Sequence, residues 1–366
     1  MDVGQSLKYA TVYGLDCMMP DKIVKKIIID DVAKVAGVSK GTVSAVINNK
    51  NSVKPETRDH VLLVMRKLNF RPKCAARYLK TDLFSKNIGI IVKDLITPSY
   101  AMIATGAKDY ADRRGYSILL SSSDDNPETE KKFFQLFSVN DIKGTILSPV
   151  VAEPAEIEHL FRWKMINYPF VLLEAVKGIN ANVVAIDNRK AVKTAVKYLI
   201  DCGHRNIVHF AGPRQSSCAQ ERIEGFRHAF SESTLVFNAD AVVYIGSNYK
   251  ESFLNTIEYF KRKNRADFPS AIICFNDQQA LSVMMALKEL SIRVPDDISL
   301  IGNDHVEHAL FYPVPLTTIH APHRQIGEKA AEIIIDNIES STPLPARHIV
   351  LETDFMIRGS TKAVNG

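Results

Sequence analysis

From residue 86 onward the chain alternates between short apolar runs rich in β-branched residues and longer segments of helical periodicity. This alternation predicts parallel, doubly wound α/β sheets, because parallel strands are joined by crossover helices. The runs that we interpret as strands are 88–92, 117–121, 145–148, 170–173, 183–186, 207–210, 242–245, 271–275 and 298–301. Nine strands are too many for one compact unit of this type, so we expect two similar lobes that divide near Asp187.

Polar residues follow several of these runs. In open α/β sheets, ligands bind beyond the carboxyl ends of the strands, so these residues predict a polar cleft between the lobes. An alternative for each aspartate is to cap the helix that follows, and we expect this of Asp277, which opens the segment QQALSVMMAL. The polar residues at these ends are Asp94, Glu174, Asp187, Asn276, Asp277 and Asp304.

The basic charge of the chain is concentrated near its beginning. Residues 21–86 contain 15 Lys and Arg against 6 Asp and Glu, whereas residues 87–366 contain 30 against 33. Such a confined excess favours a polyanion partner over a merely solvated basic face.

The same basic segment predicts short helices. Residues 29–36 (IDDVAKVA) place Val32, Val35 and Ala36 on one helical face, and Gly37 then ends the helix in a tight turn. A third helix is expected to begin at Pro55, with an apolar stripe that covers the first two helices. That stripe consists of Val61, Val64, Met65 and Leu68.

Between them lies a second helix with a polar, basic leading end. Ser39 is a suitable N-cap, and the helix turns Val43, Val46 and Ile47 inward. This is the pattern of a helix-turn-helix, whose second helix presents its first residues to base edges in the DNA major groove. The residues expected at this leading end are Lys40, Gly41, Thr42 and Ser44.

These residues predict two kinds of DNA contact. Lys40 would reach guanine acceptors, and hydroxyl groups would bind phosphate oxygens and fix the docking register. The alternative for the hydroxyls is helix capping, and for Ser39 both roles are compatible. The hydroxyl-bearing residues are Ser39, Thr42, Ser44 and Thr57.

Residues 27–80 resemble the DNA-binding headpiece and hinge of the lactose-repressor (LacI/GalR) family of bacterial transcription regulators. The family signature, DVAxxAGVSxxTVSxVxN followed by ETRxxV and RPxxxARxL, is matched with few departures. The resemblance continues over residues 27–360, through TPSY, DDNPETE, GTILSP, GHRNI, ERIEGF, FND, VPDDISLIGND and PLTTI.

The resemblance implies a fold and a function. The fold is an N-terminal three-helix helix-turn-helix headpiece plus a hinge helix, then an α/β two-lobed periplasmic-binding-protein-like core with parallel doubly wound sheets. The function is that of a transcription regulator, most often a repressor. It would bind a palindromic double-stranded DNA operator as a homodimer and respond to a small polar effector, sugar-like or nucleobase-like. A tetramer stays open, although no leucine heptad follows Gly359.

The resemblance also implies roles for DNA-contacting residues. Lys40, Gly41 and Ala45 occupy base-reading positions, and Ala45 stands where most of the family has an arginine, so the operator is expected to differ at that step. In the hinge helix, Leu79 would wedge into the minor groove, with Arg77 and Lys80 near phosphates. The alternative for Leu79 is a core leucine. Two other departures are Ile28, where a capping threonine is frequent, and Lys73, where asparagine is usual.

The effector would lie in the cleft between the lobes. Arg222 and Asp304 are the positions on which we place most weight, because a planar donor and paired acceptors orient a polar ring, on which Tyr100 would stack. For Tyr249 the alignment is ambiguous by one residue. The effector-contacting positions implied by the resemblance are Ser99, Tyr100, Glu174, Arg222, Tyr249, Asn276 and Asp304.

Domain boundaries follow from the same match. Residues 1–24 fit no part of the family pattern, and we expect a mobile extension, with Met18 or Met19 as alternative starts. The expected segments are the extension 1–24, the headpiece 25–71, the hinge helix and linker 72–86, the core 87–360 and a tail 361–366. The core would have lobes at about 87–186 plus 321–340, and at 187–318 plus 344–360.

Several other classes of protein are disfavoured. The sequence has no GxGxxG, P-loop, GxSxG or HExxH motif and no metal spacing among its histidines, so we expect neither an enzyme nor a cofactor or metal. A Rossmann-type enzyme would need a glycine loop after its first strand, where IGIIVKDLITPS has Pro98. Five scattered cysteines suit a reducing cytoplasm, and no apolar run is long enough to span a membrane. The main alternative is a solute-binding protein without DNA function, which would need an export signal in place of residues 27–80.

Overall fold

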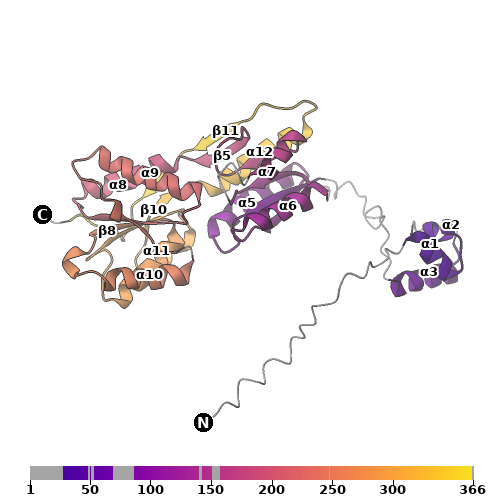
Figure 1. Cartoon of the computed structure of the whole chain (residues 1–366), viewed down its shortest axis with the longest axis horizontal. Helices are drawn as coiled ribbons and strands as arrows, with labels where there is room; N and C mark the ends of the chain where they lie inside the picture. Colours follow the sequence, from indigo (N-terminus) through magenta and orange to yellow (C-terminus); the bar gives the residue numbers. More distant parts are fainter. Residues whose placement is uncertain are drawn as a thin grey trace, which may run out of the picture. The chain divides into compact units, whose positions relative to one another are not determined.

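The computed structural model describes residues 28–47, 50, 53–68, 86–139, 142–150, 157–246 and 248–364. The chain divides into two compact units, Met1–Thr81 and Asp82–Gly366, both drawn in Figure 1 and treated separately below. The predictions for residues 1–24, for Lys73 and for the hinge residues Arg77, Leu79 and Lys80 lie outside the described residues.

The N-terminal unit contains α1 (Ile29–Ala36), α2 (Lys40–Ile47) and α3 (Pro55–Lys67), which confirms the three predicted helices. Gly37 ends α1 with φ +63°, a left-handed conformation that favours glycine. The side chain of Ile28 cannot cap α1, but the Asp31 carboxylate accepts a hydrogen bond from the Ile28 backbone N–H at 2.8 Å.

The three helices share one small apolar core. It includes Val32 and Ala36 of α1, Val43 and Val46 of α2, and the predicted stripe of α3. The prediction for Val35 is wrong, because its side chain is 59% exposed and Ala33 takes the inward position. Residues 32, 33 and 36 and residues 32, 35 and 36 both fall within one 100° arc of a helix, so the spacing alone does not separate the two faces. Packing against α2 and α3 selects the face with Ala33.

The first lobe of the larger unit contains a six-stranded sheet in the order β11-β5-β4-β3-β1-β2. Its strands pair in parallel throughout. Helices α5 and α12 cover one face through Ile88, Ile90 and Val92 of β1, while α6 and α7 cover the other through Ile91. The elements are β1 (Asn87–Val92), α5 (Pro98–Arg113), β2 (Ser117–Ser122), α6 (Pro127–Val139), β3 (Ile142–Leu147), α7 (Glu158–Met165), β4 (Phe170–Leu172), β5 (Asn182–Ile186), α12 (His323–Glu339) and β11 (His348–Leu351).

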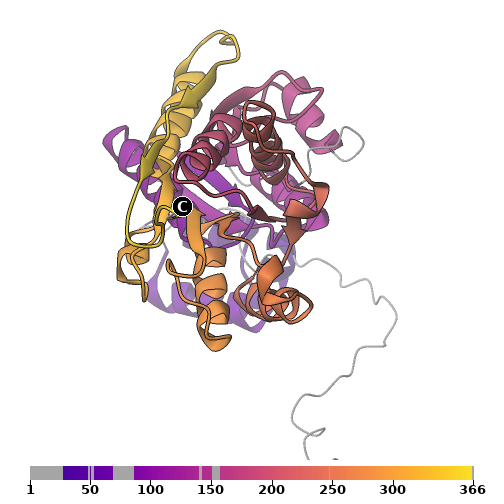
Figure 2. The same cartoon turned by 90° about the vertical axis from the view of Figure 1, so that its left-hand side faces the viewer.

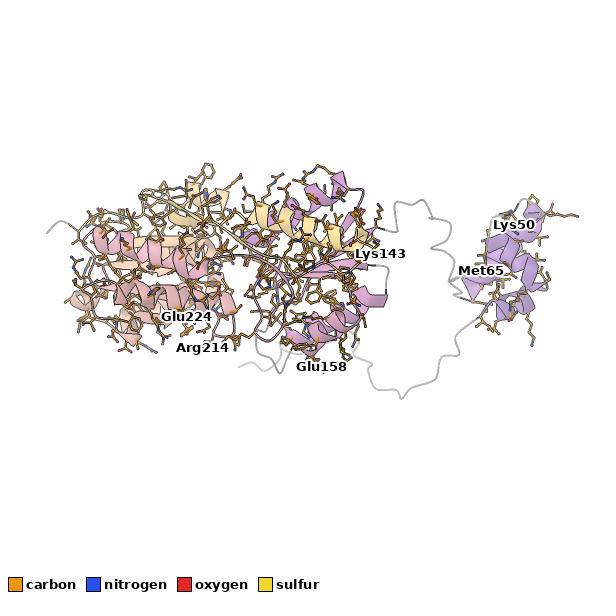
Figure 3. The ribbon with its side chains drawn as sticks, turned by 90° about the horizontal axis from the view of Figure 1, so that it is seen from above. Lys50, Met65, Lys143, Glu158, Arg214 and Glu224 are labelled. Atoms are coloured by element: carbon orange, nitrogen blue, oxygen red, sulfur yellow. The ribbon has the colours of Figure 1, made fainter. Side chains whose placement is uncertain are left out.

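The second lobe has a sheet of the same size in the order β12-β10-β9-β8-β6-β7. Here α8 and α9 cover one face and α10 and α11 the other, which completes a doubly wound arrangement. The elements are α8 (Asn188–Asp201), β6 (Ile207–Ala211), α9 (Ser217–Ser231), β7 (Val242–Tyr244), α10 (Tyr249–Lys261), β8 (Ala271–Cys274), α11 (Asp277–Glu289), β9 (Ser299–Asn303), β10 (Thr317–His320) and β12 (Asp354–Met356), with short 3-10 turns η3 (Ala239–Ala241), η4 (Arg265–Asp267) and η5 (Glu307–Phe311). Figure 3 labels Lys143 and Glu158 in the first lobe and Arg214 and Glu224 in the second.

The chain passes between the lobes at three places: between β5 and α8, between β10 and α12, and between β11 and β12. Figure 2 shows the C-terminal strands, in yellow, along one side of the two-lobed unit. The nine predicted strands are present, but β10, β11 and β12 were not predicted. The assignment of residues 344–360 to the second lobe is wrong for β11, because His348–Leu351 pairs with β5 of the first sheet.

Candidate functional site: a cleft between the lobes and a helix-turn-helix surface

A cavity of about 830 Å³ lies between the two lobes. Its walls come from loops that follow β1, β3 and β4 of the first lobe and from α8, α9 and the loops after β8 and β9 of the second. The carboxyl ends of parallel strands therefore meet at this cavity, as expected for an open α/β sheet. Six of the seven predicted effector-contacting residues line it: Ser99, Tyr100, Glu174, Arg222, Asn276 and Asp304.

Arg222 and Asp304 form a buried pair on the wall of the second lobe. Arg222 Nη2 and Asp304 Oδ1 are 3.7 Å apart, and both side chains are less than 10% exposed. Arg222 also donates to Asn188 Oδ1 at 3.1 Å and to the carbonyl oxygen of Phe275, over whose ring its guanidinium lies. Because these contacts fix the guanidinium, its charge is held at one place on the cavity wall.

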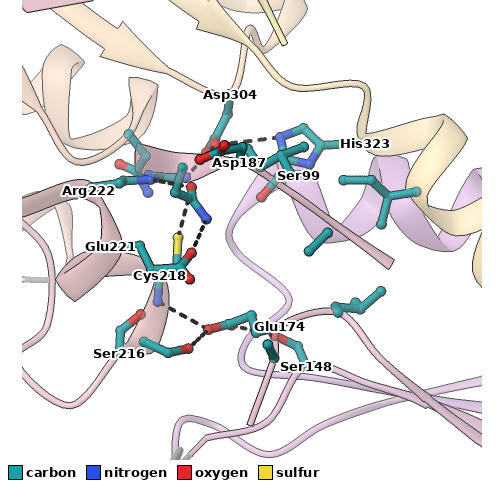
Figure 4. A pocket seen from close by; sticks show the side chains of 18 of the residues that line it. Ser99, Ser148, Glu174, Asp187, Ser216, Cys218, Glu221, Arg222, Asp304 and His323 are labelled. Atoms are coloured by element: carbon teal, nitrogen blue, oxygen red, sulfur yellow. Dashed lines mark hydrogen bonds and ion pairs between the residues drawn. The ribbon is translucent and has the colours of Figure 1, made fainter. Parts of the chain in front are cut away.

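Glu174 connects the two lobes (Figure 4). One of its carboxylate oxygens lies 2.5 Å from Lys93 Nζ of the first lobe. The other accepts hydrogen bonds from the Ser217 hydroxyl and, at 3.3 Å, from the Cys218 backbone N–H, both at the start of α9 in the second lobe. Ser148 lies 3.4 Å from the first oxygen. The carboxylate is thus held by groups of this chain on both sides of the cleft.

Of the other predicted effector-contacting residues, Ser99 and Tyr100 lie at the cavity and Tyr249 does not. Ser99 is buried in the first turn of α5, and the Tyr100 hydroxyl lies 3.4 Å from Ser148 Oγ. Burial, the largest cause, raises the pKa of Tyr100, so its hydroxyl stays protonated. Tyr249 begins α10 after the N-cap Asn248 and does not line the cavity. We therefore exclude Tyr249 from the candidate site.

The prediction that Asp277 caps α11 is wrong. Asn276 is the N-cap, and its side chain accepts a hydrogen bond from the Gln279 N–H at 2.8 Å. Asp277 is the first helical residue and is fully buried. Its carboxylate accepts from the Val306 N–H at 2.9 Å and from the Thr318 hydroxyl at 2.6 Å. Asp277 therefore ties α11 to β10 and to the loop that carries Asp304.

This environment makes stability depend on pH. Burial and the negative charge of Asp304 raise the pKa of Asp277 from 3.8 to about 8. The folded chain then holds a proton that the unfolded chain releases near pH 4. We expect this contribution to stability to be complete below pH 4 and to disappear as the pH rises to about 8. Asp277→Asn should abolish this part of the pH dependence in urea unfolding followed from pH 5 to 9, whereas an unchanged slope would contradict the assignment.

Sequence reasoning missed His323, the first residue of α12. Its Nε2 lies 3.5 Å from Asp304 Oδ1 across the cleft, and neither ring nitrogen has a hydrogen-bond partner although both are buried. No motif signals such a residue, because it belongs to the first lobe while its neighbour Asp304 comes from the second. Asp94 and Asp187, also at strand ends, accept hydrogen bonds from backbone N–H groups of Thr97 and Lys190 and act mainly as turn or helix caps.

The headpiece presents the predicted DNA-facing residues at the start of α2. Ser39 Oγ accepts from the Thr42 N–H at 3.0 Å, so Ser39 is the predicted cap. Lys40 is exposed and pairs with Asp30 at 2.9 Å, and Gly41 is also exposed. Thr42, Ser44, Ala45 and Thr57 are half-buried. An exposed pair such as Lys40–Asp30 has little net stability, so Lys40 can exchange its partner.

Two further observations concern the described part of the chain. No described helix is long and apolar enough to cross a membrane. Among the same residues, no group of three His, Cys, Asp or Glu side chains is arranged to hold a metal ion.

A helix-turn-helix unit and a two-lobed core with a polar cleft in one chain define a ligand-responsive DNA-binding regulator. The model of the bacterial regulatory proteins, lacI family, matches residues 28–73, and that of the periplasmic binding protein-like domain matches residues 196–361. The chain belongs to the LacI family of bacterial regulatory proteins, and it is a transcription regulator.

Curated relatives and solved structures are similar to this chain over more than nine-tenths of its length. The HTH-type transcriptional repressor PurR of Vibrio vulnificus is 30% identical over 340 residues, covering 92% of this chain and 99% of the relative. The protein of the same name from Haemophilus influenzae is 32% identical over 344 residues, with the same coverage. The lac repressor dimer bound to operator and the anti-inducer ONPF has a TM-score of 0.69 at 26% identity, covering 93% of this chain and all of that one. A complex of the transcriptional regulator CelR with cellobiose has a TM-score of 0.68 at 25% identity, covering 91% and 99%.

Proposed function

We propose that this chain is a repressor that binds a near-palindromic operator as a homodimer and that a small polar effector in the interlobe cavity controls its DNA affinity. The observation that carries this proposal is the polar cavity between two lobes in a chain with a helix-turn-helix headpiece. In this proposal the chain consists of a headpiece at residues 25–71, a hinge at 72–86 and a core at 87–360. The protein acts in the bacterial cytoplasm and has no catalytic activity.

On the DNA side, a dimer brings two α2 helices to two half-sites, with Lys40, Gly41 and Ala45 at base edges. The hydroxyls of Ser39, Thr42, Ser44 and Thr57 supply phosphate contacts that set the register. For the hinge we propose that Leu79 enters the minor groove, flanked by Arg77 and Lys80.

On the effector side, Ser99, Tyr100, Arg222, Asn276 and Asp304 surround the ligand. An effector that fits one lobe arrangement better than another shifts the population of arrangements and thereby changes DNA affinity. The same coupling makes operator binding change effector affinity by an equal factor.

A mobility-shift titration with DNA from the protein's own locus tests the proposal. We expect a saturable, sequence-selective complex that weakens steeply with salt, because phosphate contacts release counterions. A chain that lacks residues 1–80 should lose this complex and keep small-molecule binding. Equal binding to every duplex, or loss of both activities on deletion, would refute the modular function.

Lys40→Ala tests base reading. Loss of a guanine contact should weaken operator binding by about 1–3 kcal/mol and relax the preference at one base pair. The matched control is Lys34→Ala, which removes the same charge from the exposed surface of α1. Fluorescence anisotropy with single-base operator variants should show lost discrimination only for Lys40→Ala, and identical base preferences in both variants would remove Lys40 from the reading positions.

A further inference from the structure

We propose that the effector is an electrically neutral polar molecule, because the charged groups that would hold an anionic ligand in the cavity are already neutralised by carboxylates of the chain itself. This inference rests on the proposed function, since it takes the interlobe cavity as the effector site. It excludes phosphate esters, nucleotides and simple carboxylates as effectors.

The first neutralised group is Lys93. Its side chain is 11% exposed and its Nζ lies 2.5 Å from Glu174 Oε1, whose own side chain is 16% exposed. Burial, the largest single cause, lowers the pKa of Lys93, but the charge and hydrogen bond of Glu174, together with Tyr100 and Cys218, raise that pKa overall. Burial raises the pKa of Glu174. The positive charge of Lys93 and the hydrogen bonds that Glu174 accepts from Lys93, Ser217 and Cys218 lower this pKa overall. Both groups are therefore charged at neutral pH, and the pair has no net charge.

The second is the N-terminus of α9, a helix of 15 residues. Helix N-termini attract anions through free backbone N–H groups and the helix dipole. Here one backbone donor of the first turn, the Cys218 N–H, and the Ser217 hydroxyl both donate to the second carboxylate oxygen of Glu174. Ser216 satisfies a further donor by accepting from the Ala219 N–H at 3.3 Å. In Figure 4 Glu174 lies between Ser148 on one side and Ser216 and Cys218 on the other, in the position that an anionic ligand group would take.

The third is Arg222. Its guanidinium donates to Asn188 and to the carbonyl oxygen of Phe275, and the carboxylate of Asp304 lies 3.7 Å away. The basic residues at the rim are also paired: Arg189 with Glu221 and Glu224, Lys190 with Glu352, and Lys193 with Glu232.

An anion at Lys93, at the N-terminus of α9 or at Arg222 would have to displace one of these carboxylates or remain uncompensated. Either outcome is costly, because a buried charge without a partner loses its hydration and gains nothing in return. A neutral ligand with hydroxyl, amide or ring nitrogen groups meets no such cost. It can donate to Asp304 and accept from Arg222, and it leaves the Lys93–Glu174 pair intact.

The test is to free the anion site and supply the simplest anion. Thermal unfolding of the full chain is measured with inorganic phosphate against chloride at constant ionic strength. We expect no phosphate-specific stabilisation of the wild type. Glu174→Ala, which frees both Lys93 and the α9 N-terminus, should bind phosphate at least about tenfold more tightly than the wild type. Lys93→Met combined with Glu174→Ala should lose that gain.

The matched control is Glu221→Ala. It removes a carboxylate from α9 and from the cavity lining, but leaves Lys93 paired with Glu174. We expect this variant to remain indifferent to phosphate. Phosphate binding by the wild type, a folded Glu174→Ala variant without any gain, or an equal gain in Glu221→Ala would each overturn the inference.

A second measurement does not depend on how the variants fold. Calorimetric titration of the wild type compares neutral compounds with their phosphate esters, such as ribose with ribose 5-phosphate and a nucleoside with its 5′-monophosphate. Weak or absent binding of every ester supports the inference, and an ester that binds about tenfold more tightly than its neutral parent overturns it. Failure of the proposed function would appear instead as absence of a selective operator complex, which leaves the phosphate result unaffected.

Discussion

Asp304→Asn is expected to weaken effector binding by about ten- to a hundredfold while the fold is retained, because a charge-assisted hydrogen bond is worth roughly 1.5–3 kcal/mol. Asp304 is the carboxylate closest to the fixed guanidinium of Arg222, and it faces His323 across the cleft. Asparagine is preferable to alanine here, because residue 304 has φ +111°, which asparagine tolerates better than alanine.

The measurement is the ligand-induced shift in unfolding temperature, followed by calorimetric titration with the compound that the shift identifies. Asp187→Asn is the control, since Asp187 also lines the cavity but its carboxylate caps α8. The Asp187→Asn substitution should lower the free energy of unfolding somewhat and leave the affinity for the effector nearly unchanged. Undiminished affinity in Asp304→Asn would place the effector elsewhere.

Gly327→Ala is expected to destabilise the first lobe more than any surface substitution. A Cβ atom at Gly327 would lie 1.9 Å from the carbonyl oxygen of Ile103 on α5. The contact is reciprocal, since a Cβ at Gly106 of α5 would lie 1.9 Å from the carbonyl oxygen of Arg324 on α12. The obstacle in both cases is backbone, so the helices would have to separate. Overpacking of this kind costs about 1–3 kcal/mol and sometimes more.

Gly359→Ala is the control, because its Cβ would meet its nearest neighbours at 3.6–3.8 Å, an ordinary van der Waals distance. Urea unfolding should show a clear loss for Gly327→Ala and Gly106→Ala and almost none for Gly359→Ala. Equal stabilities would mean that the two helices are not in close contact.

The sequence predicted the fold well where its signals are local. The second helix of the headpiece is recognisable because the Ser39 cap, the glycine turn before it and the spacing of Val43 and Val46 all lie within a few residues. Strands such as β1 and β8 are continuous apolar runs. The strands β10, β11 and β12 lack that signal, because β11 and β12 are short edge strands with alternating exposure and β10 is half threonine. Their pairing is decided by distant parts of the chain.

The candidate site was predicted less completely, for a similar reason. Arg222 and Asp304 belong to the recognisable motifs ERIEGF and VPDDISLIGND, and the two side chains lie together at the cavity wall. The partners of Glu174 were not predictable, because Lys93 and Ser217 come from different lobes and only the folded chain places them on one carboxylate. Asp277 and Asn276 adjoin in sequence, and either could cap α11. The choice depends on Thr318 and Val306, which offer Asp277 hydrogen bonds from elsewhere in the lobe.

The two final strands, β11 and β12, each cover the edge of a different sheet, so a short C-terminal segment protects both lobes. β11 protects the outer edge of one sheet by pairing with β5, and β12 does the same for the other by pairing with β10. A premature stop codon shortly before His348 would therefore uncover two strand edges in a single event, one in each lobe. Exposed edges recruit further strands, so such a truncated product should aggregate rather than persist as a weakened regulator.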